Sequence, residues 1–142
     1  MTAEYPTQEA TTENRVADTN LYWRVSGWIL AIVALVGIVA QLIGNGTIIP
    51  AFLVVTWTHN VIHVVLAAIA LGMGYGGASI SAQKNTAIVI GIGYLALGVA
   101  GLVSNDLWGL GTLINLHLEI GEDLFHILLG GWGLYAGATG AH

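Results

Sequence analysis

The sequence predicts an all-α polytopic membrane protein: a bundle of four transmembrane helices built from two repeated helical hairpins. Three observations support this fold class. Hydrophobic residues make up 56% of the 142 residues, whereas charged residues make up only 8%. The segment 25–83 contains no Asp, Glu, Lys or Arg. Breaks rich in Gly, Asn and Ser divide the apolar part of the chain into four stretches.

This composition excludes several classes of protein. Soluble domains ordinarily carry about 25% charged residues, and a 14.8 kDa chain with so few charges could not cover a soluble surface. A soluble enzyme and a disordered chain are therefore excluded. Lys and Arg together number 3, too few for a basic patch that neutralises nucleic-acid phosphates. Cysteine is absent, which rules out disulfides and thiolate metal sites.

The chain divides into a polar N-terminal tail, expected at 1–20, and a membrane domain, expected at 21–142. The tail is rich in Thr and Glu and contains no apolar run, which is typical of a segment that does not pack. Each apolar stretch is long enough to cross a hydrocarbon core of about 30 Å as a helix. We expect the four spans at about 21–43, 51–75, 86–103 and 116–138.

The orientation follows from the positive-inside rule. Arg15 and Arg24 lie at or before the start of the first span, and Lys84 lies between the second and third. With four spans, all three basic residues fall on one side of the bilayer. The sequence therefore predicts a multi-pass protein of the cytoplasmic membrane with both termini in the cytoplasm.

Small residues recur at four-residue spacing in several spans, for example at Ala68, Gly72 and Gly76. This spacing lets helix backbones approach closely in lipid. The expected partners are the lipid bilayer and either copies of this chain, in a homo-oligomer, or the helices of another membrane protein.

An internal repeat links the second and fourth spans. The segment 60–67 reads Asn, two apolar residues, His, three apolar residues and Ala, and the segment 123–130 follows the same pattern with Asp first and Gly last. His63 and His126 are the equivalent histidines. Because two spans separate the copies, they run in the same direction, which implies a pseudo-two-fold axis along the membrane normal. Both histidines should lie at similar depth in the outer half of the bilayer.

Polar side chains cluster on these two spans instead of scattering through the chain. Ionisable groups inside a membrane are costly and often functional. His59 and His63 are spaced to share one helix face, as are Asp123 and His126. The cluster comprises His59, Asn60, His63, Glu119, Glu122, Asp123 and His126.

Three interpretations of the cluster remain open. In the first, its members form interhelical hydrogen bonds that set the register of the helices. In the second, His59, His63, Asp123 and His126 bind one zinc, iron or copper ion, or His63 and His126 are the axial ligands of a b-type haem; the absence of any cofactor is the favoured expectation. In the third, the cluster handles protons or ions in an oligomer.

The motifs at 59–63 and 123–126 resemble a family of small four-helix membrane proteins of bacteria and archaea that is catalogued as a domain of unknown function. Its members share a His-Asn-x-x-His segment that opens the second span and an Asp-x-x-His type segment in the fourth. The resemblance covers about 23–137. It implies the four-helix fold and draws attention to the residues of these motifs, and it implies no activity.

The leading functional hypothesis is a non-enzymatic accessory or self-assembling membrane subunit with a His/Asn/Asp cluster near the outer leaflet. The sequence shows no nucleophile paired with a base and no phosphate-binding loop, and no residue is assigned a catalytic role. A metal- or haem-binding redox subunit is the first alternative. A proton or ion conductor is the second.

Overall fold

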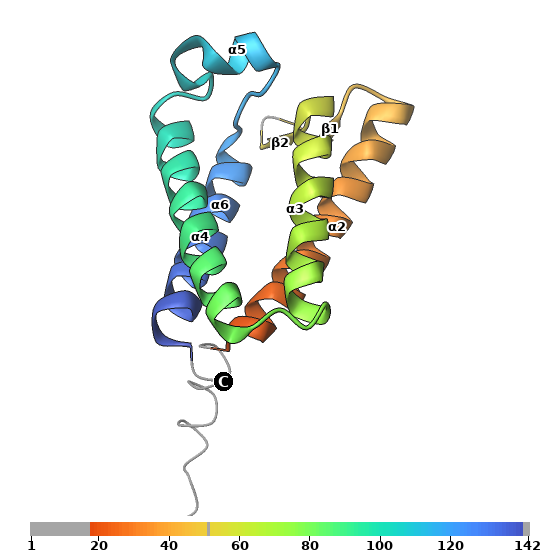
Figure 1. Cartoon of the computed structure of the whole chain (residues 1–142). Helices are drawn as coiled ribbons and strands as arrows, with labels where there is room; N and C mark the ends of the chain where they lie inside the picture. The colour runs from red at the N-terminus through yellow and green to blue at the C-terminus, as the bar shows by residue number, and fades with distance from the viewer. Residues whose placement is uncertain (1–17, 51, 141–142) are drawn as a thin grey trace, which may run out of the picture.

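The computed structural model describes residues 18–50 and 52–140, and this part of the chain is mostly helical (Figure 1). Two long helices, α2 (Thr19–Ile43) and α3 (Trp57–Tyr75), pack side by side as one hairpin. A second hairpin consists of α4 (Ile80–Val103) and α6 (Ile120–Thr139). The two hairpins converge at one end and splay apart at the other (Figure 1).

The splayed end of the molecule carries the two longer connections, 44–56 and 104–119. Between α2 and α3, the strands β1 (Thr47–Ile49) and β2 (Leu53–Val54) pair antiparallel around a turn. Between α4 and α6 lie a short 3-10 helix (Leu107–Gly109) and α5 (Leu110–Ile114). The start of α2, the end of α6 and the α3–α4 connection all lie at the opposite, convergent end (Figure 1).

Three helices in the described part of the chain, α2, α3 and α4, are long and apolar enough to span a membrane. Their outer faces expose large aliphatic side chains, including Ile32, Leu35 and Val61. Such faces suit lipid better than water. The α6 helix has 20 residues and is long enough to span a membrane. Its first two turns carry polar side chains, and it is not among the three helices that are apolar enough.

The first helix begins earlier than predicted. Asp18 caps α2, because its side chain accepts hydrogen bonds from the backbone N–H groups of Asn20 and Leu21. Thr19 is therefore the first helical residue, two residues before the expected start of the first span at about 21. The rest of that tail, 1–17, lies outside the described residues.

The other three boundaries also differ from the prediction, each for a local reason. The second helix begins later than the expected start of its span at about 51, because β2 precedes it and Thr56 caps α3. The third helix begins before 86, since Ser79 caps it, and Lys84 thus lies inside α4. The fourth helix begins at Ile120, after a non-helical stretch at 116–119, where the span was expected to begin at about 116.

The buried faces of the two hairpins correspond position by position. Each of the six buried residues of α3 has a buried counterpart in α6 63 positions later. Each of the six buried residues of α4 likewise has a buried counterpart in α2 64 positions earlier. The α3 set and its α6 counterparts are His59/Glu122, Asn60/Asp123, His63/His126, Ala67/Gly130, Ala70/Gly133 and Gly74/Gly137.

The convergent end holds the tightest core. Tyr22 and Trp23 of α2 are each 1% exposed and pack against small residues of the other helices. Trp23 donates its indole N–H to the backbone carbonyl of Gln83, 3.1 Å away. This bond joins the first hairpin to the second and fixes the end from which the helices diverge.

Candidate ligand cavity between the hairpins

The polar residues of α3 lie at its start, on the side that faces the second hairpin. Thr56 accepts a hydrogen bond from the N–H of His59 (3.3 Å) and so fixes the first turn. One turn later, the ring of His63 stacks on that of His59, with ring centres 5.7 Å apart. Both histidines are buried, at 3% and 6% exposure, which places two imidazoles in the interior of the helical bundle.

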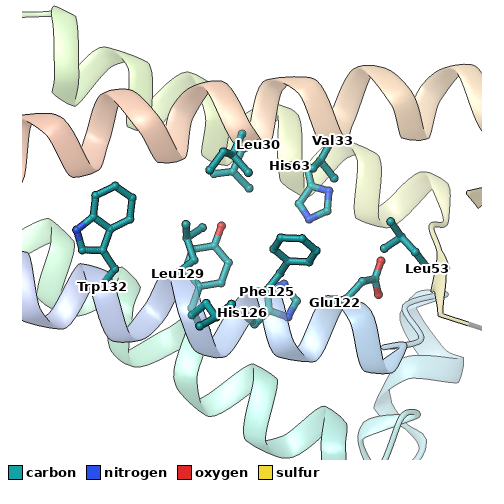
Figure 2. A pocket seen from close by; sticks show the side chains of 12 residues that line it. Leu30, Val33, Leu53, His63, Glu122, Phe125, His126, Leu129 and Trp132 are labelled. Atoms are coloured by element: carbon teal, nitrogen blue, oxygen red, sulfur yellow. The ribbon is translucent and has the colours of Figure 1, made fainter. Parts of the chain in front are cut away.

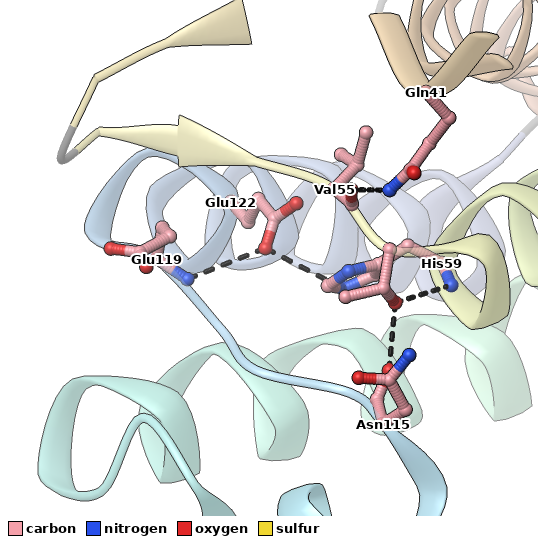
Figure 3. A network of polar contacts seen from close by, with 7 residues as sticks. Gln41, Val55, His59, Asn115, Glu119 and Glu122 are labelled. Atoms are coloured by element: carbon pink, nitrogen blue, oxygen red, sulfur yellow. Dashed lines mark hydrogen bonds and ion pairs between the residues drawn. The ribbon is translucent and has the colours of Figure 1, made fainter. Parts of the chain in front are cut away.

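The start of α6 brings a carboxylate to these histidines. Glu119 and Glu122 form a capping box, in which the Glu122 carboxylate accepts a hydrogen bond from the Glu119 N–H (3.3 Å). The same oxygen of Glu122 lies 3.5 Å from Nε2 of His59 (Figure 3). His59 and Glu122 hold equivalent places in the two hairpins, and they are in contact with each other.

Backbone and hydroxyl groups join the two hairpins around this pair. Thr56 donates its hydroxyl to the carbonyl of Asn115 (2.7 Å). Thr58 donates to the carbonyl of Ile114 (2.9 Å). The N–H of Gly121 donates to the carbonyl of Phe52 (3.1 Å). These bonds join the two hairpins at the splayed end of the bundle.

Asn60 and Asp123 face the partner helix of their own hairpin. The Asn60 side chain lies against Gly37 of α2, and the Asp123 carboxylate lies against Gly101 of α4. In both cases a methyl group on the glycine would collide with the polar side chain. The structure therefore does not place Asp123 with the histidines predicted as its co-ligands.

No three His, Asp or Glu side chains within 18–50 and 52–140 are arranged to hold a metal ion. Two of the predicted ligands, His63 and His126, do meet at one site, because both line a single cavity between the hairpins. His59 contacts this site through His63 and Glu122, whereas Glu119 contributes to the helix cap.

The cavity has a volume of about 270 Å³ and is mostly apolar. Figure 2 shows His63 on one side and Phe125, His126 and Glu122 on the other, with Trp132 and Leu53 at opposite ends. All four long helices contribute to its wall. The lining residues are Ile29, Leu30, Val33, Leu53, His63, Tyr94, Glu122, Phe125, His126, Leu128, Leu129 and Trp132.

The four polar residues of this wall share one property. His63, Tyr94, Glu122 and His126 are each less than 10% exposed, and each has a buried polar atom without a hydrogen-bond partner. These atoms are Nδ1 of both histidines, the Tyr94 hydroxyl and Oε1 of Glu122. An unpaired buried polar group is destabilising by about 1–3 kcal/mol, so four around one cavity require an explanation.

Sequence reasoning did not connect Tyr94 to the cluster. Its ring stacks on His126, with ring centres 5.3 Å apart. Tyr94 corresponds to Leu30 in the first hairpin, so the repeat pattern gave no signal for a polar residue there. Gln83 was also missed: it is 5% exposed and binds Trp23 from inside α4, where a loop was expected. His117, by contrast, lies outside the cavity beside Asp106 (3.5 Å).

Comparisons with known proteins add no relative: no family model, no curated protein and no solved structure matches this chain. The function must therefore be argued from the geometry of the cavity.

Proposed function

We propose that this protein is a non-enzymatic membrane subunit that holds a small lipid-soluble molecule in the cavity between its two hairpins. One observation carries the proposal: four cavity-lining side chains, each more than nine-tenths buried, have polar atoms without partners. A bound molecule with a polar head would find polar side chains in an otherwise apolar wall, which is the usual make-up of a ligand pocket.

The route into the cavity also favours a lipid-soluble occupant. Several residues of its rim belong to the outer surface of the helices: Ile29 is 38% exposed, Phe125 58% and Leu128 70%. These side chains would face acyl chains in a bilayer. A molecule dissolved in the membrane would therefore enter sideways, between α2 and α6, without crossing water.

We further propose that α6 is a fourth span and that the two hairpins are copies of one ancestral unit. The position-by-position match of buried residues supports the duplication, as do the paired contacts of Asn60 with Gly37 and of Asp123 with Gly101. The length of α6 and its packing along α4 support the fourth span. In this arrangement the cavity lies beside the pseudo-two-fold axis.

A b-type haem is a second candidate occupant, because His63 and His126 both line the cavity. The volume of about 270 Å³ favours a smaller group, since pockets for drug-sized ligands begin at about 300 Å³. An absorbance spectrum and an elemental analysis of the same purified sample distinguish the two. A Soret band or one equivalent of metal, lost in a His63→Ala variant, would replace our proposal with this one.

Proton or ion conduction is a third candidate, and the contact string from His63 through His59 to Glu122 favours it. Reconstituted protein would then make liposomes leak protons, and His59→Ala would abolish the leak. A subunit that only binds a ligand would not cause such a leak.

Native mass spectrometry of protein purified in mild detergent tests the binding proposal. Wild-type protein should carry an additional bound mass that organic solvent extracts. Val33→Phe, which fills the cavity from α2, should lose most of it. Ile32→Phe is the matched control, because Ile32 is 58% exposed and points away from the cavity wall. Equal occupancy in both variants, or no bound mass in wild type, would contradict the proposal.

A further inference from the structure

We infer that the molecule held in the cavity is a lipid-soluble quinone: a flat ring with an oxygen at each end and an apolar tail. This inference rests on the proposed function and names the chemical class of its ligand. It follows from the charge of the cavity wall, from the distribution of its hydrogen-bonding atoms and from its aromatic rings.

The charge of the wall excludes anionic head groups. The described residues that line the cavity include one acidic residue, Glu122, and no Lys or Arg. A fatty-acid carboxylate or a lipid phosphate would meet a carboxyl group without a compensating cation in a medium of low dielectric. The head group should therefore be neutral.

The hydrogen-bonding atoms lie on both sides of the cavity. His63 projects from α3, whereas Glu122 and His126 project from α6 on the opposite side (Figure 2). A sterol or a long-chain alcohol has one hydroxyl group and could satisfy only one side. A quinone has two carbonyl oxygens at opposite ends of its ring, and its reduced form has two hydroxyl groups there.

The types of atom match both forms of such a ring. A neutral imidazole has one N–H donor and one acceptor nitrogen, and a tyrosine hydroxyl can donate or accept. His63 and Tyr94 can therefore donate to quinone oxygens. In the reduced form, Glu122 and the histidines can accept from the hydroxyl groups.

The aromatic residues of the wall suit a flat ring. Tyr94 and His126 already form a stacked pair, and the ring of Phe125 also lines the cavity. Offset-stacked aromatic rings gain about 0.5–1.5 kcal/mol beyond the area that they bury. Past these rings, the end of the cavity at Leu129 and Trp132 is apolar and can take the start of a hydrocarbon tail.

Trp132 provides the readout for a direct test. Quinones quench tryptophan fluorescence at short range, so a benzoquinone with a decyl chain should quench wild-type protein in detergent saturably. Trp132→Phe should lose the saturable part. Tyr94→Phe removes only the hydroxyl group and should weaken binding about fivefold, as expected for one hydrogen bond. Tyr135→Phe, at a site outside the cavity, should bind like wild type.

A second probe separates the two ways in which the test can fail. A bromine-labelled long-chain alcohol is neutral, quenches tryptophan and has a single hydroxyl group. If it quenches Trp132 saturably and the quinone does not, or if Tyr94→Phe binds the quinone as tightly as wild type, the quinone inference is overturned and the proposed function stands. If neither probe quenches Trp132 in protein with intact helical circular dichroism, both fail.

Discussion

At the scale of single residues, the most informative feature is a polar side chain pressed against a glycine. Asn60 meets Gly37, and Asp123 meets Gly101, in the same place of each hairpin. A side chain larger than hydrogen at either glycine would displace the polar side chain or push the helices apart, because well-packed interiors tolerate added volume poorly. The two glycines thus set how closely the helices of each hairpin approach.

We predict that Gly101→Ala destabilises the protein by about 1–3 kcal/mol, the usual effect of overpacking. Unfolding in mixed micelles, followed by circular dichroism, measures the change. Gly93→Ala is the matched control in the same helix, because a methyl group there would meet no atom within 4 Å. It should be neutral or stabilising by up to about 1 kcal/mol, since alanine favours helix over glycine. A Gly101→Ala variant as stable as the control would refute the close approach.

At the scale of secondary-structure elements, the caps decide where the helices begin. Thr56 has two roles: it caps α3 through the His59 N–H and donates to the carbonyl of Asn115 in the other hairpin. Glu122 likewise caps α6 and contacts His59. The residues that start the helices are thus the residues that join the hairpins at their splayed ends.

Replacing Thr56 with alanine should lower the free energy of unfolding by about 1–2 kcal/mol, through loss of the cap and of the bond to Asn115. Thr56→Ser keeps the hydroxyl group and should behave like wild type. Thr139→Ala removes a comparable hydroxyl bond at the exposed end of α6 and should change stability by less than about 0.5 kcal/mol. If Thr56→Ala and Thr139→Ala lowered the melting temperature equally, the Thr56 hydroxyl would not stabilise the contact between the two hairpins.

The sequence predicted the helical class, because apolar length is a local signal, and the repeated motif drew attention to His63 and His126, which both line the cavity. It misplaced the helix starts, since caps such as Asp18, Thr56 and Ser79 lie in polar stretches that look like loops. The cavity could not be predicted at all. It depends on how far two hairpins diverge, and the spacing of residues within one helix contains no information about that distance.

At the scale of the whole molecule, the arrangement places Arg24 and Lys84 at the convergent end, with the start of α2 and the end of α6. The positive-inside rule assigns that end to the cytoplasm. The two strands and α5 then face the outside, as does the cluster of His59 and Glu122. This orientation and the fourth span remain predictions.

Cysteine labelling can test both, because the natural chain contains no cysteine. Leu113→Cys on α5, where the native side chain is 80% exposed, should react with a membrane-impermeant maleimide on intact cells. Ser81→Cys and Thr139→Cys should react only after permeabilisation. Labelling of Thr139→Cys from outside would show that α6 does not cross the bilayer, and labelling of Ser81→Cys from outside would reverse the orientation.

The contact between His59 and Glu122 bears on the history of the fold. Two identical hairpins related by a two-fold axis would have to present the same residue to each other at this position, either two imidazoles or two carboxylates. Like groups in a buried site cannot both be charged without repulsion. Fusing the two copies into one chain removes that restriction, since each half can then mutate alone. Under the proposed duplication, an acid opposite a base is an arrangement that a symmetric dimer of single hairpins could not have encoded.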